Sequence, residues 1–155
     1  MQKKGARVGD GGEVWEMIST KGRYGLRVMI DLAEHDGGCV PLKDIARRQE
    51  ISKKYLEILA KDLVRGNLIR GESGKGGGYR LLRPAEDYTV GEIIERMEGT
   101  LASVACLAEN AEACPRTACC QTLPLWQEYD RVVRDFLYSK KLSDLVRPEK
   151  NLDEP

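Results

Sequence analysis

The sequence predicts a mainly α-helical protein with a small β wing, namely a winged helix-turn-helix with a long C-terminal dimerisation helix. Two helical patterns joined by a short turn, and then two strand-like runs around the glycine-rich segment GESGKGGG, lie between Pro41 and Leu82. A wide apolar stripe at helical spacing follows near the C-terminus. This order is typical of a DNA-reading module with an appended pairing helix.

Composition and charge favour a soluble protein with a nucleic-acid partner. The 155 residues are 41% hydrophobic and 32% charged, and no apolar run approaches the roughly 20 residues that a membrane span needs. Residues 43–83 hold 11 Lys and Arg against 5 Asp and Glu, whereas residues 84–135 hold 4 against 10. A basic segment attracts phosphates even when the total charge is zero. The first 16 residues lack the apolar stretch of a signal peptide, so we expect a cytoplasmic protein and no membrane partner.

The predicted winged helix-turn-helix domain covers residues 18–83 and follows a disordered, functionless extension at residues 1–17. Its first helix runs over about 18–36, with Thr20 as the N-cap. Lys21 lies in the first turn, where a cation is unfavourable against the helix dipole. A DNA phosphate beside Thr20 and Lys21 would explain this cation, and an ordinary exposed charge is the alternative.

The next two helices carry most of the predicted DNA contacts. Residues 41–49 form one helix, and Ser52 caps the other, residues 53–66. The inner face of the second helix is apolar and comprises Leu56, Leu59, Ala60 and Leu63. In helix-turn-helix proteins the N-terminal part of this helix contacts bases and phosphates, which here designates Ser52, Lys53, Lys54, Tyr55 and Glu57. Glu57 can accept a hydrogen bond from a cytosine amino group; plain solvation of these side chains is the alternative.

The wing is predicted to have strands at Leu68–Arg70 and Tyr79–Leu82. Lys75 lies at the tip of the loop between them, and Gly76 and Gly77 let the loop backbone approach a DNA groove. The loop lacks the phosphate-binding pattern GxxxxGK[ST] and does not lead into a helix, so we discount nucleotide binding.

Residues 84–121 are predicted to form a short helix and a cysteine-bearing sensor loop. The capping box Thr89-Val90-Gly91-Glu92 opens a helix that Gly99 ends. The loop that follows carries four of the five cysteines of the chain: Cys106, Cys114, Cys119 and Cys120. Without an export signal, such a cluster favours metal binding or redox chemistry over a disulfide framework. The spacings C-x7-C and C-x5-C do not fit zinc sites, which use close cysteine pairs.

Residues 122–147 are predicted to form the dimerisation helix and one further turn, and residues 148–155 a frayed tail. The apolar stripe of this helix comprises Leu125, Trp126, Tyr129, Val132, Val133, Phe136 and Leu137. It is wide for one surface helix, so it is either core or, as we prefer, a two-fold interface. A homodimer would match a palindromic double-stranded DNA operator.

Four segments together resemble a known family: STKGRYGLRVMIDLAEH, PLKDIARRQEISKKYLEILAKDLVRGNLI, GKGGGYRL and a three-cysteine loop ending C-x5-W. Over residues 18–146 the chain is similar to the IscR-type (Rrf-two) transcriptional regulators, which also include NsrR and CymR. The resemblance implies an iron–sulfur cluster held by Cys106, Cys114 and Cys120, with Cys119 as a candidate fourth ligand. By analogy with IscR, we expect a 2Fe–2S cluster first and a 4Fe–4S cluster second.

The chain departs from the family pattern at three positions. Leu123 stands where the IscR branch has a ligand histidine, and Arg23 stands where the NsrR branch has a ligand carboxylate. Ser73 replaces the base-reading wing arginine of IscR. Glu57, by contrast, matches the glutamate of the IscR recognition helix.

These observations predict a dimeric DNA-binding transcription regulator, not an enzyme, that senses cluster status, redox state or nitric oxide through its loop cysteines. The alternative is a cluster-free regulator controlled by thiol oxidation or by a partner protein, as in regulators of cysteine metabolism. An iron–sulfur redox protein ranks last, because the chain has no CxxC pair, no cofactor fingerprint and a single histidine, His35.

Overall fold

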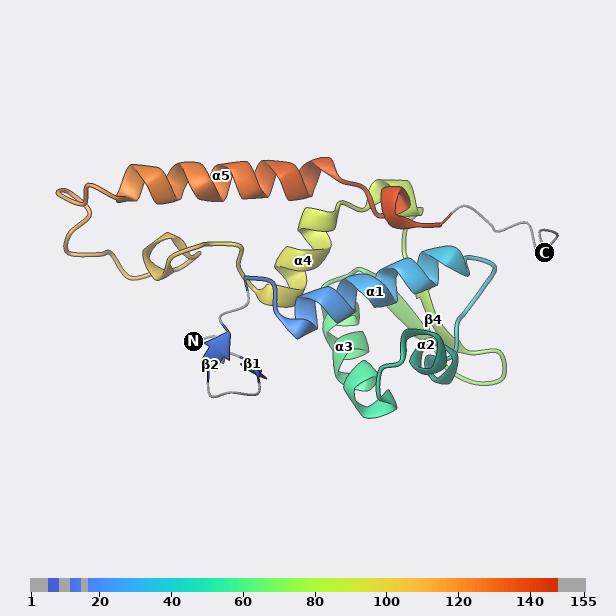
Figure 1. Ribbon diagram of the computed structural model, residues 1–155. Coiled ribbons are helices and arrows are strands. Elements are labelled where there is room, and N and C mark those ends of the chain that lie inside the picture. The colour runs from blue at the N-terminus through green and yellow to red at the C-terminus, as the bar shows by residue number, and fades with distance from the viewer. Residues whose placement is uncertain (1–5, 9–11, 15–16, 148–155) are drawn as a thin grey trace, which may run out of the picture.

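The computed structural model describes residues 6–8, 12–14 and 17–147. Figure 1 shows a helical body with a small two-stranded wing, and a long helix that lies across the body and extends beyond it. The strands and α-helices, in chain order, are β1 (Ala6–Val8), β2 (Gly12–Val14), α1 (Thr20–Glu34), α2 (Leu42–Gln49), α3 (Lys53–Arg65), β3 (Ile69–Glu72), β4 (Gly78–Leu81), α4 (Val90–Glu98) and α5 (Leu123–Ser139). This arrangement confirms the predicted fold class. No helix among the described residues is both long and apolar enough to cross a membrane.

The sequence predicts that residues 1–17 are disordered and that residues 148–155 form a frayed tail. β1 and β2 lie within the extension predicted to be disordered and pair antiparallel, with Ala6 opposite Val14. The rest of residues 1–16 lies outside the described residues, as does the predicted tail at 148–155.

Short one-turn helices cover Ala85–Asp87, Ala105–Leu107 and Leu142–Leu145.

The core lies where α1, α3 and α4 meet. The predicted inner face of α3 is fully buried, with no more than 2% exposure of Leu56, Leu59, Ala60 and Leu63. These side chains pack with Met29 of α1 and Ile93 of α4. The apolar spacing therefore predicted which face of the recognition helix points inward, and it fixes which side chains are left outside.

The helix N-termini confirm two predicted caps and correct a third. Ser52 Oγ accepts from Tyr55 N at 3.2 Å, and Thr89 Oγ1 accepts from Glu92 N at 3.1 Å. The prediction of Thr20 as the first cap is wrong, because Ser19 occupies that position and its Oγ accepts from Gly22 N at 3.3 Å. The Glu98 carboxylate of α4 decides the choice, since it accepts from both the backbone N–H and the hydroxyl of Ser19 at 2.8 Å.

Tyr88 ties the base of the wing to the body. Its buried ring directs the hydroxyl at the ends of both strands, where it donates to Leu68 O at 2.7 Å and accepts from Leu82 N at 2.9 Å and Arg83 N at 3.0 Å. The wing itself is the antiparallel pair β3–β4, with Ile69 opposite Leu81. Both strands lie within a residue or two of their predicted positions.

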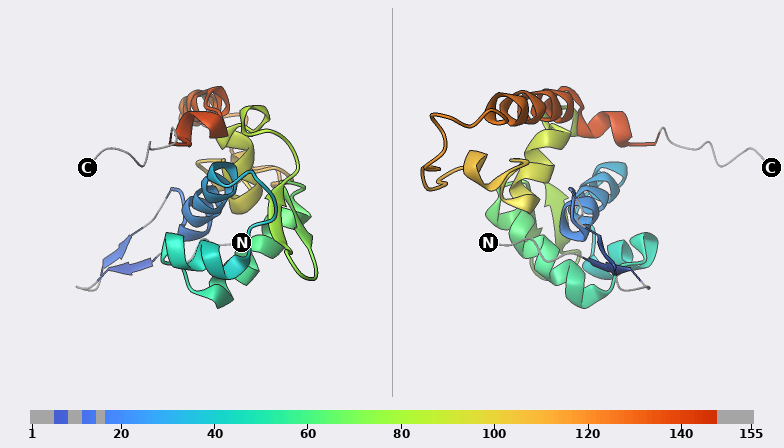
Figure 2. Two further views of the ribbon diagram at one scale, coloured as in Figure 1. Left: turned by 90° about the vertical axis from the view of Figure 1, so that its right-hand side faces the viewer. Right: turned by 60° about the vertical axis from the view of Figure 1, so that its left-hand side comes forward.

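The long helix α5 contacts the body mainly through α4, as Figure 2 shows from two further directions. At Gly91 of α4 the two helices come so close that a Cβ would collide with the Tyr138 ring. Arg134 Nη1 pairs with Glu95 Oε1 at 2.6 Å, and the Tyr138 hydroxyl donates to the same carboxylate. α5 contains no fully buried residue.

Candidate nucleic-acid interface and cysteine loop

The N-terminal turns of α3 present the predicted DNA contacts to solvent. Ser52, Lys53, Lys54 and Glu57 are exposed. Lys53, Lys54 and Glu57 form no hydrogen bond or ion pair with the residues that the structure describes, so their charges are available to a ligand. α3 also exposes Lys61 and Arg65 farther along, two cations outside the predicted DNA contacts.

Tyr55 differs from its neighbours because it is half-buried. Its ring meets the Tyr24 ring edge-to-face at 6.0 Å, and the Arg27 guanidinium lies 4.9 Å from the centre of the Tyr24 ring. Burial raises the pKa of the Tyr55 hydroxyl, and nearby Lys21 opposes this increase. Tyr55 therefore joins α3 to α1 in addition to its predicted contact with phosphate.

The two predicted contacts on α1 already have partners inside the molecule. Lys21 Nζ lies 2.7 Å from Asp62 Oδ2 of α3, and Thr20 Oγ1 accepts from Arg23 Nη2 at 3.3 Å. The ion pair accounts for a cation in the first turn of α1 without a phosphate. Lys21 remains 41% exposed, so it still faces solvent beside α3.

A buried polar network sets the angle between α1 and the helix-turn-helix. The side chain of Asp31 is 1% exposed, and it accepts from Arg48 Nε at 3.0 Å, from Arg48 Nη2 at 2.6 Å and from Gln49 Nε2 at 2.9 Å. Arg27 donates to the side chain of Gln49 at 3.1 Å and to its backbone carbonyl. Both partners of Asp31 lie in the last turn of α2, immediately before the turn to the recognition helix.

The wing carries one cation that is free of partners among the described residues. Glu72 lies between Arg70 and Arg80, 3.0 Å and 2.9 Å away, so both arginines are paired and the three residues together carry a net charge of about +1. Lys75 is exposed at the tip, where Gly74 and Gly76 have positive φ angles of 92° and 78°. Gly76 is also exposed, and Gly77 is half-buried. Among the described residues, the tip therefore carries the single charge of Lys75.

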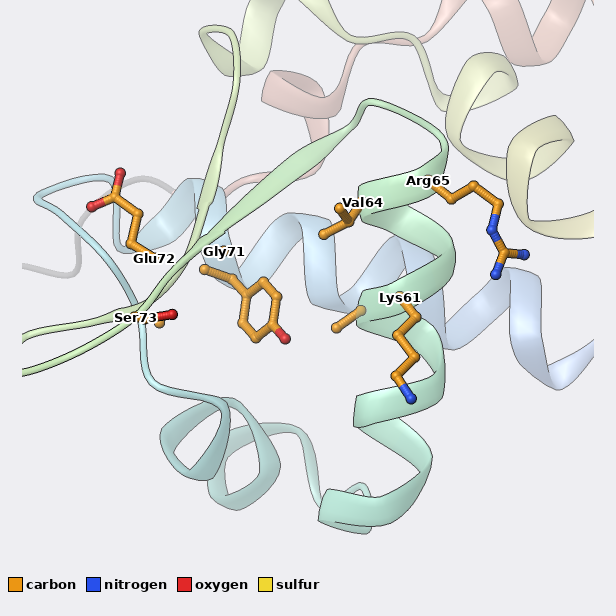
Figure 3. A pocket seen from close by; sticks show the side chains of 9 residues that line it. Lys61, Val64, Arg65, Gly71, Glu72 and Ser73 are labelled. Atoms are coloured by element: carbon orange, nitrogen blue, oxygen red, sulfur yellow. The ribbon is translucent and has the colours of Figure 1, made fainter.

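A groove of about 590 Å³ separates the second half of α3 from the wing. Figure 3 shows Val64 on the α3 side facing the wing residues Gly71 and Ser73, with Lys61 and Arg65 on the same helix. Tyr79 lines the groove from β4. Because residues of both elements line the groove, the recognition helix and the wing form one continuous surface.

The four loop cysteines lie on the segment between α4 and α5. Cys106 and Cys119 are exposed, and Cys114 and Cys120 are half-buried. The structure does not bring Cys106, Cys114 and Cys120 together, and within the described part of the chain no group of three or more His, Cys, Asp or Glu side chains is arranged around a metal position. The hydrogen bonds of the loop are mostly local ones such as Cys119 N to Arg116 O at 2.9 Å.

Cys120 is the cysteine whose surroundings favour the thiolate. Its Sγ lies 3.5 Å from Thr122 Oγ1 at the start of α5. Hydrogen bonds from the Thr122 side chain and from the backbone of Thr122 and Leu123 lower the pKa of the Cys120 thiol, and Arg116 adds to this effect. A helix N-terminus stabilises a thiolate, which is the form that binds metal and reacts with oxidants.

The remaining candidate ligands lie elsewhere. Cys39 is half-buried beside the wing, where burial and the Glu72 carboxylate raise the pKa of its thiol. His35 Nδ1 lies 2.7 Å from the Asp31 carbonyl oxygen at the end of α1. The side chains of Leu123 and Arg23 cannot ligate iron. Cys119 is the remaining sulfur donor of the loop.

Comparison with known proteins identifies the family. The family model Rrf2, described as an iron-dependent transcriptional regulator, matches residues 18–148. The chain belongs to the Rrf2 family. This confirms the resemblance seen in the sequence, and it makes the chain a DNA-binding transcription regulator and not an enzyme.

Members of the Rrf2 family with different names are about equally similar to this chain. Protein rrf2 of Nitratidesulfovibrio vulgaris is 40% identical over 131 residues, 84% of this chain and 87% of that protein. The structure of T. potens IscR has a TM-score of 0.67 and 32% identity, covering 94% of this chain and 95% of that one. CymR (YrzC), the global cysteine regulator of B. subtilis, has a TM-score of 0.67 and 37% identity, covering 85% and 96%.

Proposed function

We propose that this Rrf2-family regulator binds palindromic duplex DNA as a homodimer and senses an iron–sulfur cluster through its loop cysteines. The single observation that carries the DNA part is the cluster Lys53, Lys54 and Glu57 at the start of α3, which is exposed and has no partner among the described residues. In a helix-turn-helix these positions enter the major groove. The groove between α3 and the wing then seats the sugar–phosphate strand, with Lys61 beside it and Lys75 reaching the next groove.

Substitutions of Glu57 and Lys53 test sequence specificity and overall DNA affinity separately. Glu57 accepts from a cytosine amino group in our docking, and base-edge contacts specify sequence whereas phosphate contacts position the protein. Glu57→Ala is expected to change the preferred sequence more than the affinity for random DNA. Lys53→Ala is expected to weaken binding to all sequences and to reduce the slope of log affinity against log salt by about one.

Operator selection from a random duplex library, followed by titrations at several fixed salt concentrations, measures both effects. Glu50→Ala is a suitable control, since Glu50 is an exposed acid in the turn before α3. An unaltered sequence preference in Glu57→Ala would show that α3 docks in another register.

The homodimer is supported by the outer face of α5. Leu125, Tyr129, Val132 and Phe136 follow one another at spacings of four, three and four residues, and they are 57%, 39%, 55% and 58% exposed in the single chain. These four residues form the α5 stripe. The stripe is not part of the core of one chain, and its spacing is that of a helix packed along a second helix. A second copy of α5 is its proposed partner.

The donor chemistry of the loop fits an iron–sulfur cluster. Cys106, Cys114 and Cys120 would hold the cluster, and Cys119 is the candidate fourth ligand. The thiolate of Cys120 is stabilised before any metal binds, because Thr122 and the start of α5 donate hydrogen bonds to it. When bound, a cluster would supply an iron–sulfur centre that oxidants, nitric oxide or iron shortage can remove. We expect the 2Fe–2S form ahead of 4Fe–4S.

Hydrogen bonds and one ion pair connect the cysteine loop with the recognition helix. Ser103 N donates to Asp130 Oδ1 of α5 at 2.9 Å, which fastens the start of the loop. Just before the loop, Glu98 binds the first cap of α1 through Ser19. Lys21, two residues farther along, pairs with Asp62 of α3. Loop order can therefore alter DNA affinity to the extent that it favours one position of α1 and α3 over another.

The sensing proposal is tested with anaerobically purified and reconstituted protein. We expect a visible chromophore with stoichiometric iron and sulfide, lost in Cys106→Ala, Cys114→Ala and Cys120→Ala but retained in Cys39→Ala. Comparing Cys119→Ala with Cys120→Ala tests the fourth ligand. Operator affinity is then measured with and without the cluster at one salt concentration. Equal affinities for every selected operator would remove the sensing role and leave the DNA-binding role intact.

The second candidate is a cluster-free regulator controlled by thiol oxidation or by a partner protein. The similarity to CymR and the lowered pKa of Cys120 favour it. This candidate predicts a colourless protein whose operator affinity changes on mild oxidation and is restored by a dithiol. Insensitivity of Cys120→Ala to the oxidant would assign that control to Cys120.

A further inference from the structure

The outermost line of side chains on α3 consists of three cations and one isoleucine. Lys54, Ile58, Lys61 and Arg65 follow at spacings of four, three and four residues, which places them in one row along the helix. Ile58 is 48% exposed. The opposite face of α3 packs into the core through four apolar side chains that are no more than 2% exposed. Ile58 therefore plays no part in the core.

The surroundings of Ile58 argue against a protein-docking role. Its neighbours in the row are Lys54 and Lys61, both exposed and charged. The other exposed large apolar side chain of α3, Val64, lies in the groove beside the wing and not in the row. Protein-docking surfaces need a contiguous apolar patch, and one isoleucine flanked by lysines does not form one among the described residues.

We propose that Ile58 reads the C5-methyl group of a thymine in the major groove. This rests on the proposed insertion of α3 into DNA. The thymine methyl is the apolar group that base pairs present in the major groove, and apolar side chains recognise it by contact. Lys54 and Lys61, one turn before and one turn after, would hold phosphates on either side of the base edge that Ile58 meets. A β-branched side chain in a helix has one strongly preferred rotamer, so it loses little freedom on contact.

Ile58 and Glu57 together define the kind of base step that α3 would read. Glu57 adjoins Ile58 on the exposed side of the helix and is assigned to a cytosine amino group. Adjacent side chains on one helix reach the same or neighbouring base pairs. The pair therefore selects a cytosine and a thymine at neighbouring positions in each half-site.

The test removes single methyl groups from the DNA. An operator is first selected from a random duplex library with the wild-type protein. Each thymine is then replaced by uracil, which keeps the base pairing and lacks only the C5-methyl group. We expect one thymine per half-site at which the replacement weakens wild-type binding by about fourfold, the value for one buried methyl group. Ile58→Ala should bind the thymine and uracil operators with equal affinity.

Leu145→Ala is the matched control, because it truncates another exposed branched aliphatic side chain, 41% exposed, in the one-turn helix Leu142–Leu145 outside the proposed DNA surface. It should keep the full thymine preference, and circular dichroism melts should show both variants folded. An equal uracil penalty in wild type and Ile58→Ala would overturn the inference. A sequence-specific binder that is insensitive to every uracil replacement would overturn it too, while leaving the proposed function standing. Absence of sequence-specific binding would instead overturn the proposed function.

Discussion

At the scale of single residues, Asp31 shows how a buried charge can orient a DNA-binding motif. Its carboxylate, on α1, is buried and accepts hydrogen bonds from Arg48 and Gln49 at the end of α2. A buried carboxylate needs such partners, because desolvation without them costs several kcal/mol. The bidentate hydrogen bonds from Arg48 also fix direction, since a guanidinium meets a carboxylate in one plane.

Asp31→Ala should therefore destabilise the protein strongly. The change leaves the Arg48 guanidinium and the Gln49 amide without their acceptor, and breaking one side of a buried pair costs about 3 kcal/mol. Urea unfolding monitored by circular dichroism measures the loss. Glu128→Ala is the control: Glu128 and Arg131 are 70% and 65% exposed, and such surface pairs contribute about 0–1 kcal/mol. Similar losses in the two variants would show that the Asp31 network does not support the fold.

At the scale of elements, the contact between α4 and α5 depends on one carboxylate. Burial works to raise the pKa of Glu95, but hydrogen bonds from Arg134 and Tyr138 outweigh it and lower the pKa below the ordinary 4.5. Arg134 also lies over the Tyr138 ring, 4.7 Å from its centre. This cluster holds α5, and the cysteine loop that leads into it, against the body.

The lowered pKa of Glu95 predicts a pH dependence of stability. A group whose pKa is lower in the folded state stabilises the protein above its unfolded pKa, and this contribution disappears as the pH falls through the folded value. Glu95→Gln should lower the free energy of unfolding by about 1 kcal/mol at pH 7, the usual contribution of a partly exposed hydrogen-bonded pair. The difference from wild type should shrink below pH 4.5.

Urea unfolding of both proteins between pH 3 and 7 measures this dependence. Glu86→Gln, an exposed acid in the one-turn helix before α4, serves as the control. A constant difference between wild type and Glu95→Gln over the whole range would show that the Glu95 charge does not act through this cluster.

Elements also show what could be predicted from the sequence and what could not. Caps such as Ser52 and Thr89, and the buried face of α3, were predicted because these signals act within one or two turns. The partners of Lys21, Asp31 and Glu98 lie on other elements and leave no periodic mark in the sequence. For that reason the sequence leaves Lys21 between a phosphate contact and an exposed charge, and it does not reveal the pairing with Asp62. Ser19 is the cap in place of Thr20 because its hydroxyl donates to Glu98 of α4, a contact between distant residues that the local sequence does not show.

In the candidate site, too, features set by nearby residues could be predicted from the sequence, and features set by distant residues could not. The exposed start of α3 could be predicted from the burial of its opposite face, and Ile58 could have been found by asking which side of α3 it occupies. The environment of Cys120 depends on Thr122, two residues away, and a local reading could have found it. The groove beside the wing required the structure, because Val64 and Tyr79 come from different elements.

At the scale of the whole molecule, α5 gives the chain an elongated shape. In Figure 1 the helix lies over α4 and extends past the helical body, and the cysteine loop lies at its far end. The α5 stripe faces solvent along this length. A two-fold axis beside α5 would pair the two stripes, place two recognition helices on one duplex and bring both cysteine loops next to the interface.

Val132→Glu should break this dimer. An isologous interface receives each substitution twice, so two carboxylates would enter one apolar seam, each at a desolvation cost. We expect the dimer dissociation constant to rise at least about a hundredfold, which corresponds to about 2.7 kcal/mol. Sedimentation equilibrium measures it. Gln127→Glu adds the same charge on an exposed position of α5 outside the stripe, and it should remain dimeric.

Operator binding should follow the change in assembly. Each monomer can occupy only one half-site, so Val132→Glu should lose the preference for two properly spaced half-sites while keeping its affinity for an isolated one. The far-UV circular dichroism spectrum should be unchanged, because Val132 is 55% exposed in the single chain and contributes little to its core. A Val132→Glu protein that stays dimeric and keeps the spacing preference would place the two-fold axis elsewhere. The cysteine loops would then lie away from the dimer interface, and loop order could reach α3 only within one chain, through Glu98 and Lys21.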